Sequence, residues 1–83
     1  MLTDEFLEGW NASQPDIDNP YIWSSDAWLA YLAGADFCRL APVSAPIRAK
    51  KSRGNVIRVW TAGGNEWRVE YTAHYGLKGV VRA

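Results

Sequence analysis

Two residue types that often carry catalysis, histidine and cysteine, each occur once in the chain, as His74 and Cys38. A general base needs a nucleophile or a carboxylate held against it, and nothing in the spacing of these two residues places one beside the other. His74 lies between Ala73 and Tyr75 near an expected turn, so we interpret it as a surface histidine. Cys38 follows an aromatic residue at an expected helix end, and we interpret it as a buried, unreactive thiol. These residues predict no catalytic site.

Metal and phosphate sites are not indicated either. Structural zinc usually takes four cysteine or histidine ligands, and this chain has one of each. Asp16 and Asp18 share a loop but lack the twelve-residue calcium-binding pattern. Gly63 and Gly64 lack the lysine and the serine or threonine of a phosphate-binding loop. We therefore expect no metal, no cofactor and no enzymatic activity.

Charge divides the chain into two halves. Residues 1–36 contain seven acidic residues and no lysine or arginine, whereas residues 37–83 contain nine basic residues and two acidic ones. The formal charges are −7 and +7, although the whole chain is neutral. This asymmetry predicts two separate electrostatic surfaces and charged partners. The alternative is that the halves neutralise one another by packing together, or that copies of the chain associate head to tail.

Protein binding is the function that the acidic half favours. Carboxylates without counter-charges can imitate a phosphate backbone and dock on the basic groove of a machine that handles nucleic acid. The chain has five tryptophans, a residue type enriched at interface hot spots, and Trp10 and Trp23 are placed where we expect partial exposure. The alternative is that the tryptophans fill the core. The candidate protein-binding residues are Asp4, Glu5, Glu8, Trp10, Asp16, Asp18, Tyr21 and Trp23.

Nucleic-acid binding is the alternative that the basic half favours. Lysine and arginine clusters beside aromatic strands contact phosphates, and exposed aromatic rings stack on bases. Trp60, Trp67 and Tyr71 would form the stacking platform if they are exposed, and the core if they are buried. A further alternative is a structural protein that self-assembles through its charged halves. The basic residues of the nucleic-acid alternative are Arg48, Lys50, Lys51, Arg53 and Arg58.

The acidic residues lie mainly on an expected helix and in the loop after it. Thr3 is a candidate N-cap, and the acidic residues that follow it suit the positive end of a helix dipole. Apolar residues then recur at helical spacing, which predicts a helix over 4–12. Two prolines mark a loop over 13–23.

A second helix is predicted over 25–37, capped by Ser24 or Ser25. Its Gly34 either ends the helix or weakens it. Prolines exclude a helix further on, so residues 41–54 are predicted to form a long connector that carries the basic cluster.

Strands are expected in the rest of the basic half. Val56–Thr61 and Glu66–Thr72 are rich in β-branched and aromatic residues and flank a Gly-Gly hairpin turn, and Leu77–Arg82 is a third candidate. A turn of two or four residues makes Trp60 and Trp67 cross-strand neighbours, whereas a turn of three separates them. The first register puts on one face Val56, Arg58, Trp60, Trp67, Val69 and Tyr71.

These elements predict an α+β fold, with two N-terminal helices packed on a small antiparallel sheet. A length of 83 residues fits one domain over 1–83. No apolar run approaches the ~20 residues of a membrane helix, and no signal-peptide layout is present. With a single cysteine, the chain is expected to be a protein of the reducing cytoplasm.

Residues 8–37 resemble a known family. The matching positions are E-G-W-N-A over 8–12, N-P-Y over 19–21, A-W-L over 27–29, and Gly34. They resemble the ribosome modulation factor-like family, short bacterial and phage proteins with two helices bridged by a Pro-Tyr loop. The resemblance implies that Pro20 fixes the turn and that Tyr21 packs between the helices. It also implies a bacterial or phage origin, and we expect a phage or mobile-element product such as an inhibitor of a defence system.

Overall fold

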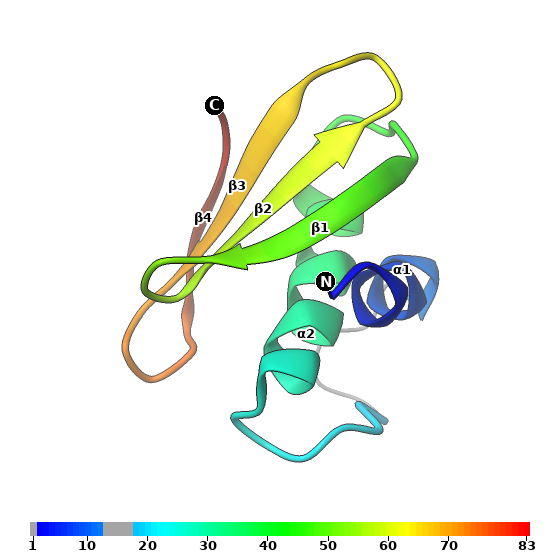
Figure 1. Cartoon of the computed structure of the whole chain (residues 1–83). Coiled ribbons are helices and arrows are strands. Elements are labelled where there is room, and N and C mark those ends of the chain that lie inside the picture. Colours follow the sequence, from blue (N-terminus) through cyan, green and yellow to red (C-terminus); the bar gives the residue numbers. More distant parts are fainter. Residues whose placement is uncertain (1, 13–17) are drawn as a thin grey trace.

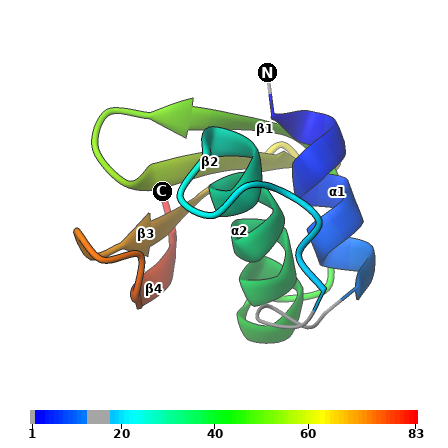
Figure 2. The same cartoon turned by 90° about the horizontal axis from the view of Figure 1, so that it is seen from below.

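The computed structural model describes residues 2–12 and 18–83. Two helices precede a four-stranded antiparallel sheet whose strands lie in chain order, which confirms the predicted α+β class (Figure 1). Both helices cover the same face of the sheet, and the other face is open (Figures 1 and 2). The elements are α1 (Thr3–Ala12), α2 (Asp26–Leu40), β1 (Pro46–Ser52), β2 (Val56–Thr61), β3 (Glu66–Tyr71) and β4 (Leu77–Arg82).

Helix α1 begins at Thr3, one residue before the predicted start. The Thr3 hydroxyl does not act as an N-cap. It donates to the carbonyl oxygen of Ala49 at 3.4 Å and accepts from the Ala49 amide at 3.3 Å. Thr3 therefore ties the start of α1 to β1, while the acidic residues of the first turn remain at the positive end of the helix dipole.

Helix α2 is capped by Ser25, whose Oγ accepts a hydrogen bond from the amide of Trp28 at 3.1 Å. This is one of the two caps that the sequence predicted. The helix continues to Leu40, so the predicted end at residue 37 is three residues short. Gly34 does not end the helix but lies within it.

Two glycines explain how closely the helices approach each other. A Cβ added to Gly34 would lie 1.9 Å from the carbonyl oxygen of Phe6, and one added to Gly9 would lie 1.8 Å from the carbonyl oxygen of Tyr31. No side chain fits at these distances, so the two helix backbones touch at a point that only glycine permits.

The predicted connector over 41–54 is wrong, because it contains β1, an edge strand of the sheet. Within β1 only Pro46 and Ala49 are buried, so the strand lacks the alternating apolar pattern that would have revealed it. Pro46 is tolerated because it is the first residue of an edge strand. The basic cluster is consequently held on a sheet rather than in a loop.

The hairpin between β2 and β3 has a three-residue turn, over 62–64. The amide of Thr61 donates to the carbonyl oxygen of Asn65 at 3.1 Å, and Gly64 has a φ of 82°. A three-residue turn with glycine in the left-handed region is a common hairpin geometry. The turn shifts the register by one residue relative to the one we favoured.

The Trp60–Trp67 pair is therefore wrong. Trp60 lies opposite Glu66, and Trp67 lies opposite Val59. The face of β2 that packs on the helices carries Ile57, Val59 and Thr61. The residues of β2 predicted to face the core are on the open face instead: Val56, Arg58 and Trp60.

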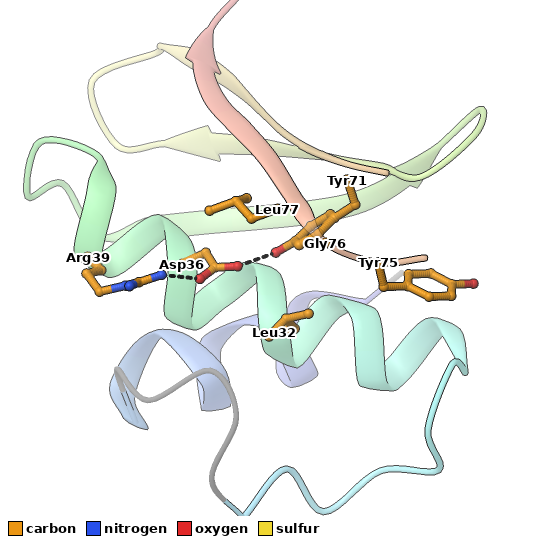
Figure 3. Close-up of a pocket in the computed structure, with 7 residues that line it drawn as sticks. All are labelled: Leu32, Asp36, Arg39, Tyr71, Tyr75, Gly76 and Leu77. Atoms are coloured by element: carbon orange, nitrogen blue, oxygen red, sulfur yellow. Dashed lines mark hydrogen bonds and ion pairs between the residues drawn. The ribbon is translucent and has the colours of Figure 1, made fainter. Parts of the chain in front are cut away.

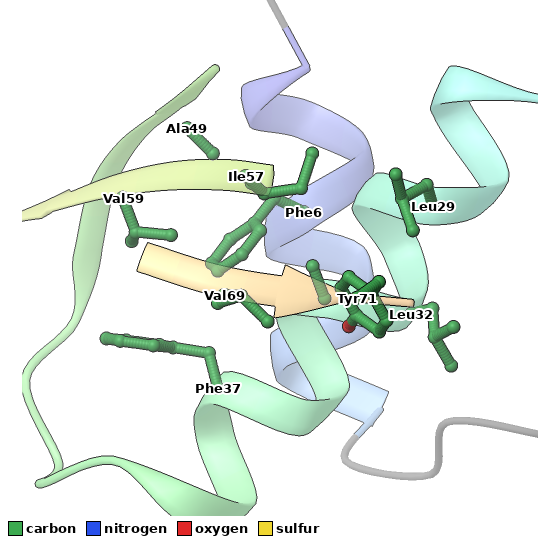
Figure 4. Packing of buried hydrophobic residues seen from close by; sticks show 10 residues of the cluster. Phe6, Leu29, Leu32, Phe37, Ala49, Ile57, Val59, Val69 and Tyr71 are labelled. Carbon is green, nitrogen blue, oxygen red and sulfur yellow. The ribbon is translucent and has the colours of Figure 1, made fainter. Parts of the chain in front are cut away.

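The hydrophobic core fills the space between the helices and the covered face of the sheet (Figure 4). The Phe6 ring of α1 and the Trp67 ring of β3 each lie with centroids 5.8 Å from Phe37 of α2. Both helices and the sheet thus meet at Phe37. The core cluster consists of Phe6, Leu29, Leu32, Ala33, Phe37, Ala49, Ile57, Val59, Val69 and Tyr71.

Candidate protein and nucleic-acid interfaces

One carboxylate of α1 contacts Tyr21, and two others on the same helix act on it through their charge. The hydroxyl of Tyr21 donates a hydrogen bond to Oε1 of Glu8 at 2.8 Å. This hydrogen bond raises the pKa of Tyr21 to about 12, with smaller contributions from desolvation and from the negative charges of Glu8, Glu5 and Asp4. We call Asp4, Glu5, Glu8 and Tyr21 the acidic surface. The fold thus brings four of the eight predicted protein-binding residues together.

The loop before α2 holds Tyr21 in place. Asn19 accepts from the Tyr21 amide through Oδ1 at 3.2 Å and donates to the carbonyl oxygen of Trp28 through Nδ2 at 3.2 Å. The Tyr21 ring meets Tyr31 of α2 edge-on, with centroids 6.1 Å apart. Tyr21 therefore contacts both helices, as expected of a residue packed between them.

The acidic surface has no counter-charge from the described part of the chain. The ion pairs found there are Arg39–Asp36, Lys51–Asp26 and Arg58–Glu66. None of them includes a carboxylate of the acidic surface, nor the exposed Asp18. Oε2 of Glu5 is buried and has no hydrogen-bond partner among residues 2–12 and 18–83. Asp16, the remaining acidic candidate, lies outside the described residues.

The next two residues of the loop expose apolar surface. Ile22 is 83 % exposed and Trp23 is 70 % exposed. The Trp23 ring lies on an aromatic cluster, with centroids 6.0 Å from Trp28 and 6.3 Å from Tyr75 of the β3–β4 turn. Trp10, in contrast, is half-buried and packs against the core. Ile22 is absent from the sequence prediction, although its place beside the Pro-Tyr turn was a usable signal.

The open face of the sheet collects three of the five predicted basic residues: Arg48, Lys50 and Arg58. Successive side chains of a strand point to opposite faces, so Lys51 projects from the other face of β1. Its Nζ lies 3.7 Å from Oδ1 of Asp26 in α2. Arg53 lies in the turn between β1 and β2.

Arg68 is new to the candidate site, and Trp60 is the one residue of the predicted stacking platform that lies on this face. Arg68 of β3 lies directly opposite Arg58, and Trp60 lies directly opposite Arg48. The guanidinium carbon of Arg48 is 4.1 Å from the centroid of the Trp60 ring, and that of Arg58 is 5.0 Å from it. We call Arg48, Lys50, Arg58, Trp60 and Arg68 the basic face. The correct hairpin register would have placed Arg58, Trp60 and Arg68 on one face, but Arg48 and Lys50 join it only through the missed strand β1.

A pocket of about 310 Å³ lies between α2 and the β3–β4 turn (Figure 3). Its buried Asp36 carboxylate accepts hydrogen bonds from the Tyr71 hydroxyl at 2.8 Å and from Arg39 at 2.7 Å. Burial, together with the Asp36 charge, raises the pKa of Tyr71 well above its ordinary range. Because these polar groups bond to one another, the cluster holds β3 on α2.

Neither the single histidine nor the single cysteine of the chain belongs to the acidic surface or to the basic face. His74 is exposed in the β3–β4 turn, as predicted. Cys38, which was predicted to be buried, is only half-buried on α2, so that prediction is wrong. In residues 2–12 and 18–83, no group of three acidic, histidine or cysteine side chains is placed to hold a metal ion. None of the helices in those ranges has the length and apolar character needed to cross a membrane.

Comparison of the chain with protein-family models, with curated proteins and with solved structures gives no match. The functional argument consequently depends on the two surfaces themselves.

Proposed function

We propose that this protein is a small non-enzymatic binding protein that docks its acidic surface on a basic surface of a nucleoprotein machine and blocks it. The observation that carries the proposal is that Asp4, Glu5 and Glu8 of α1 form no ion pair with a cation from the described part of the chain, while Glu8 binds Tyr21. Carboxylates left uncompensated in the folded state attract a basic partner over long range and accelerate its association.

The exposed pair Ile22 and Trp23 supplies the apolar part of the same interface. Charges at the rim of an interface mainly set association rate and partner choice, whereas aromatic anchors supply much of the affinity. Trp23 is supported from beneath by Trp28 and Tyr75, so its ring is presented on a packed base. Such an anchor loses little conformational freedom on binding.

A phage or mobile-element product that inhibits a bacterial machine fits this design. The support is the small size, the phosphate-like acidic surface and the sequence resemblance over residues 8–37. Occlusion needs no catalytic group, because a bound domain excludes substrate by its volume.

Affinity capture from a bacterial lysate, with and without nuclease, tests the proposal. The test variant is Asp4→Asn/Glu8→Gln, whose amide at position 8 still accepts the Tyr21 hydrogen bond. The matched control is Glu70→Gln, which removes a carboxylate from the open sheet face. We expect one protein assembly to be captured despite nuclease by wild type and control, and to be lost with the test variant.

Equal capture by all three proteins would overturn the proposal, and so would capture that disappears with nuclease. Light scattering of the free protein at low salt completes the test. A mass that rises above the monomer and falls with added salt would favour self-assembly through the two charged surfaces instead.

A further inference from the structure

The basic face contains a row of three cations on three adjacent strands. Lys50 of β1 lies opposite Arg58 of β2, and Arg58 lies opposite Arg68 of β3. Neighbouring strands are about 4.8 Å apart, so the backbone positions of the three cationic residues lie within about 10 Å. Like charges directly opposite one another destabilise a sheet. The sequence thus maintains an arrangement that is unfavourable for the free protein.

The protein's own carboxylates relieve this row in part, because Glu66 pairs with Arg58 and the charge of Arg68 also helps to lower the pKa of Glu66. Arg58 pairs with Glu66 at 2.7 Å. Among the described residues no ion pair includes Lys50, Arg68 or Arg48. The row therefore has capacity for an anion with several charges spaced along it, which is the property of a phosphodiester backbone.

The tryptophan beside the row adds a second recognition element. Arg48 and Arg58 both contact the Trp60 ring, so one indole and two guanidinium groups lie together on the open face. Indole and guanidinium planes both stack on nucleobases. These contacts hold the indole in place among the cations of the open face.

We propose that the basic face binds single-stranded nucleic acid, with the backbone along the Lys50–Arg58–Arg68 row and a base against the Trp60 group. Stacking needs an unpaired base, which a duplex does not present. Four strands also span about 14 Å between the outer strand axes, more than the ~12 Å width of the DNA major groove. This ligand and face are distinct from those of the acidic surface, and either proposal can fail alone.

Fluorescence anisotropy of a labelled mixed-sequence oligonucleotide tests the inference, with single-stranded RNA, single-stranded DNA and duplex DNA as separate arms. We expect both single strands to bind more tightly than the duplex. With about four phosphates contacted, the logarithm of affinity should fall with the logarithm of salt with a slope of about −3.

Two variants identify the face. Lys50→Gln/Arg68→Gln should weaken binding on the order of tenfold to a hundredfold at ~0.05 M salt and make the salt slope shallower by about 1.4, because two phosphate contacts are lost. Its melting temperature should equal or exceed that of wild type, because the like-charge row is relieved. Trp60→Ala should weaken binding about 5- to 150-fold, with Trp60→Phe retaining most of it.

The matched control is Arg53→Gln, a charge removed from the turn next to the sheet, and it should change affinity by less than about threefold. No binding of either single strand at low salt would overturn the inference, as would duplex binding as tight as single-strand binding. If wild type binds no oligonucleotide and Lys50→Gln/Arg68→Gln loses the nuclease-resistant capture of a protein, the face would be assigned to a protein partner instead.

Discussion

Tyr71→Phe tests how the sheet is fixed on α2. The side chain of Asp36 is 4 % exposed and accepts two hydrogen bonds, from Tyr71 at 2.8 Å and from Arg39 at 2.7 Å. Removing the phenol hydroxyl leaves a buried carboxylate with one donor but leaves the ring in place, so no large cavity forms. Hydrogen bonds to charged groups contribute about 1.5–3 kcal/mol. A loss of ~2 kcal/mol lowers the melting temperature of a domain this size by about 8–16 °C.

The assay is thermal unfolding followed by circular dichroism, with Tyr21→Phe as the matched control. That substitution removes the same hydroxyl from an exposed bond to Glu8, which water can replace, so its melting temperature should fall much less. Equal melting temperatures for the two variants, or a Tyr71→Phe protein as stable as wild type, would refute the reasoning that Asp36 depends on Tyr71.

Three further outcomes follow from the structure. Gly34→Ala should abolish folding or melt far below wild type, because its Cβ would meet backbone at 1.9 Å, whereas Gly63→Ala, with its nearest contact at 3.6 Å, should change the melting temperature little. A pH titration of tyrosinate absorbance, taken as the difference between wild type and Tyr21→Phe, should place the Tyr21 pKa near 12, and Glu8→Gln should lower this pKa. Because the pKa is raised in the folded state, the stability that the Tyr21–Glu8 hydrogen bond contributes is complete below pH 10.0 and is lost between pH 10.0 and about 12. Trp23→Ala should cost less than about 1 kcal/mol in urea unfolding, because the ring is 70 % exposed, so a loss of partner capture in this variant would report docking rather than misfolding.

The helical half was the more predictable part of the chain. Its elements depend on local signals, and Ser25 and the Pro-Tyr loop act where the sequence indicated. The role of Gly34 was missed because glycine usually ends or weakens a helix, whereas here its missing side chain permits contact with α1. A contact between distant segments leaves no local trace in the sequence.

The sheet shows where sequence reasoning failed. β1 is an edge strand with lysines and an initial proline, features that protect edges from aggregation but conceal the strand pattern. The β2–β3 register depended on one choice, the length of a glycine-rich turn. That choice decided whether Trp60 belonged to the core or to the open face, and with it the whole basic face.

Among the candidate residues, those on the helix were easier to predict than those on the sheet. Asp4, Glu5 and Glu8 recur on one helix, so their gathering could be predicted from periodicity alone. Arg68 joins the basic cluster only through cross-strand pairing, which composition does not encode. The charge asymmetry of the two halves was visible in the sequence, but the composition of the basic face was not.

The central claim is that folding separates the chain's charge into an acidic surface on α1 and a basic face on the sheet, each acting on its own partner. The most direct measurement is amide chemical-shift mapping by NMR during titration with a single-stranded oligonucleotide, at several salt concentrations. The account predicts salt-sensitive shifts on β1, β2 and β3 around Lys50, Trp60 and Arg68, with α1 and Tyr21 unchanged. Shifts centred on α1, or spread evenly over both surfaces, would contradict it.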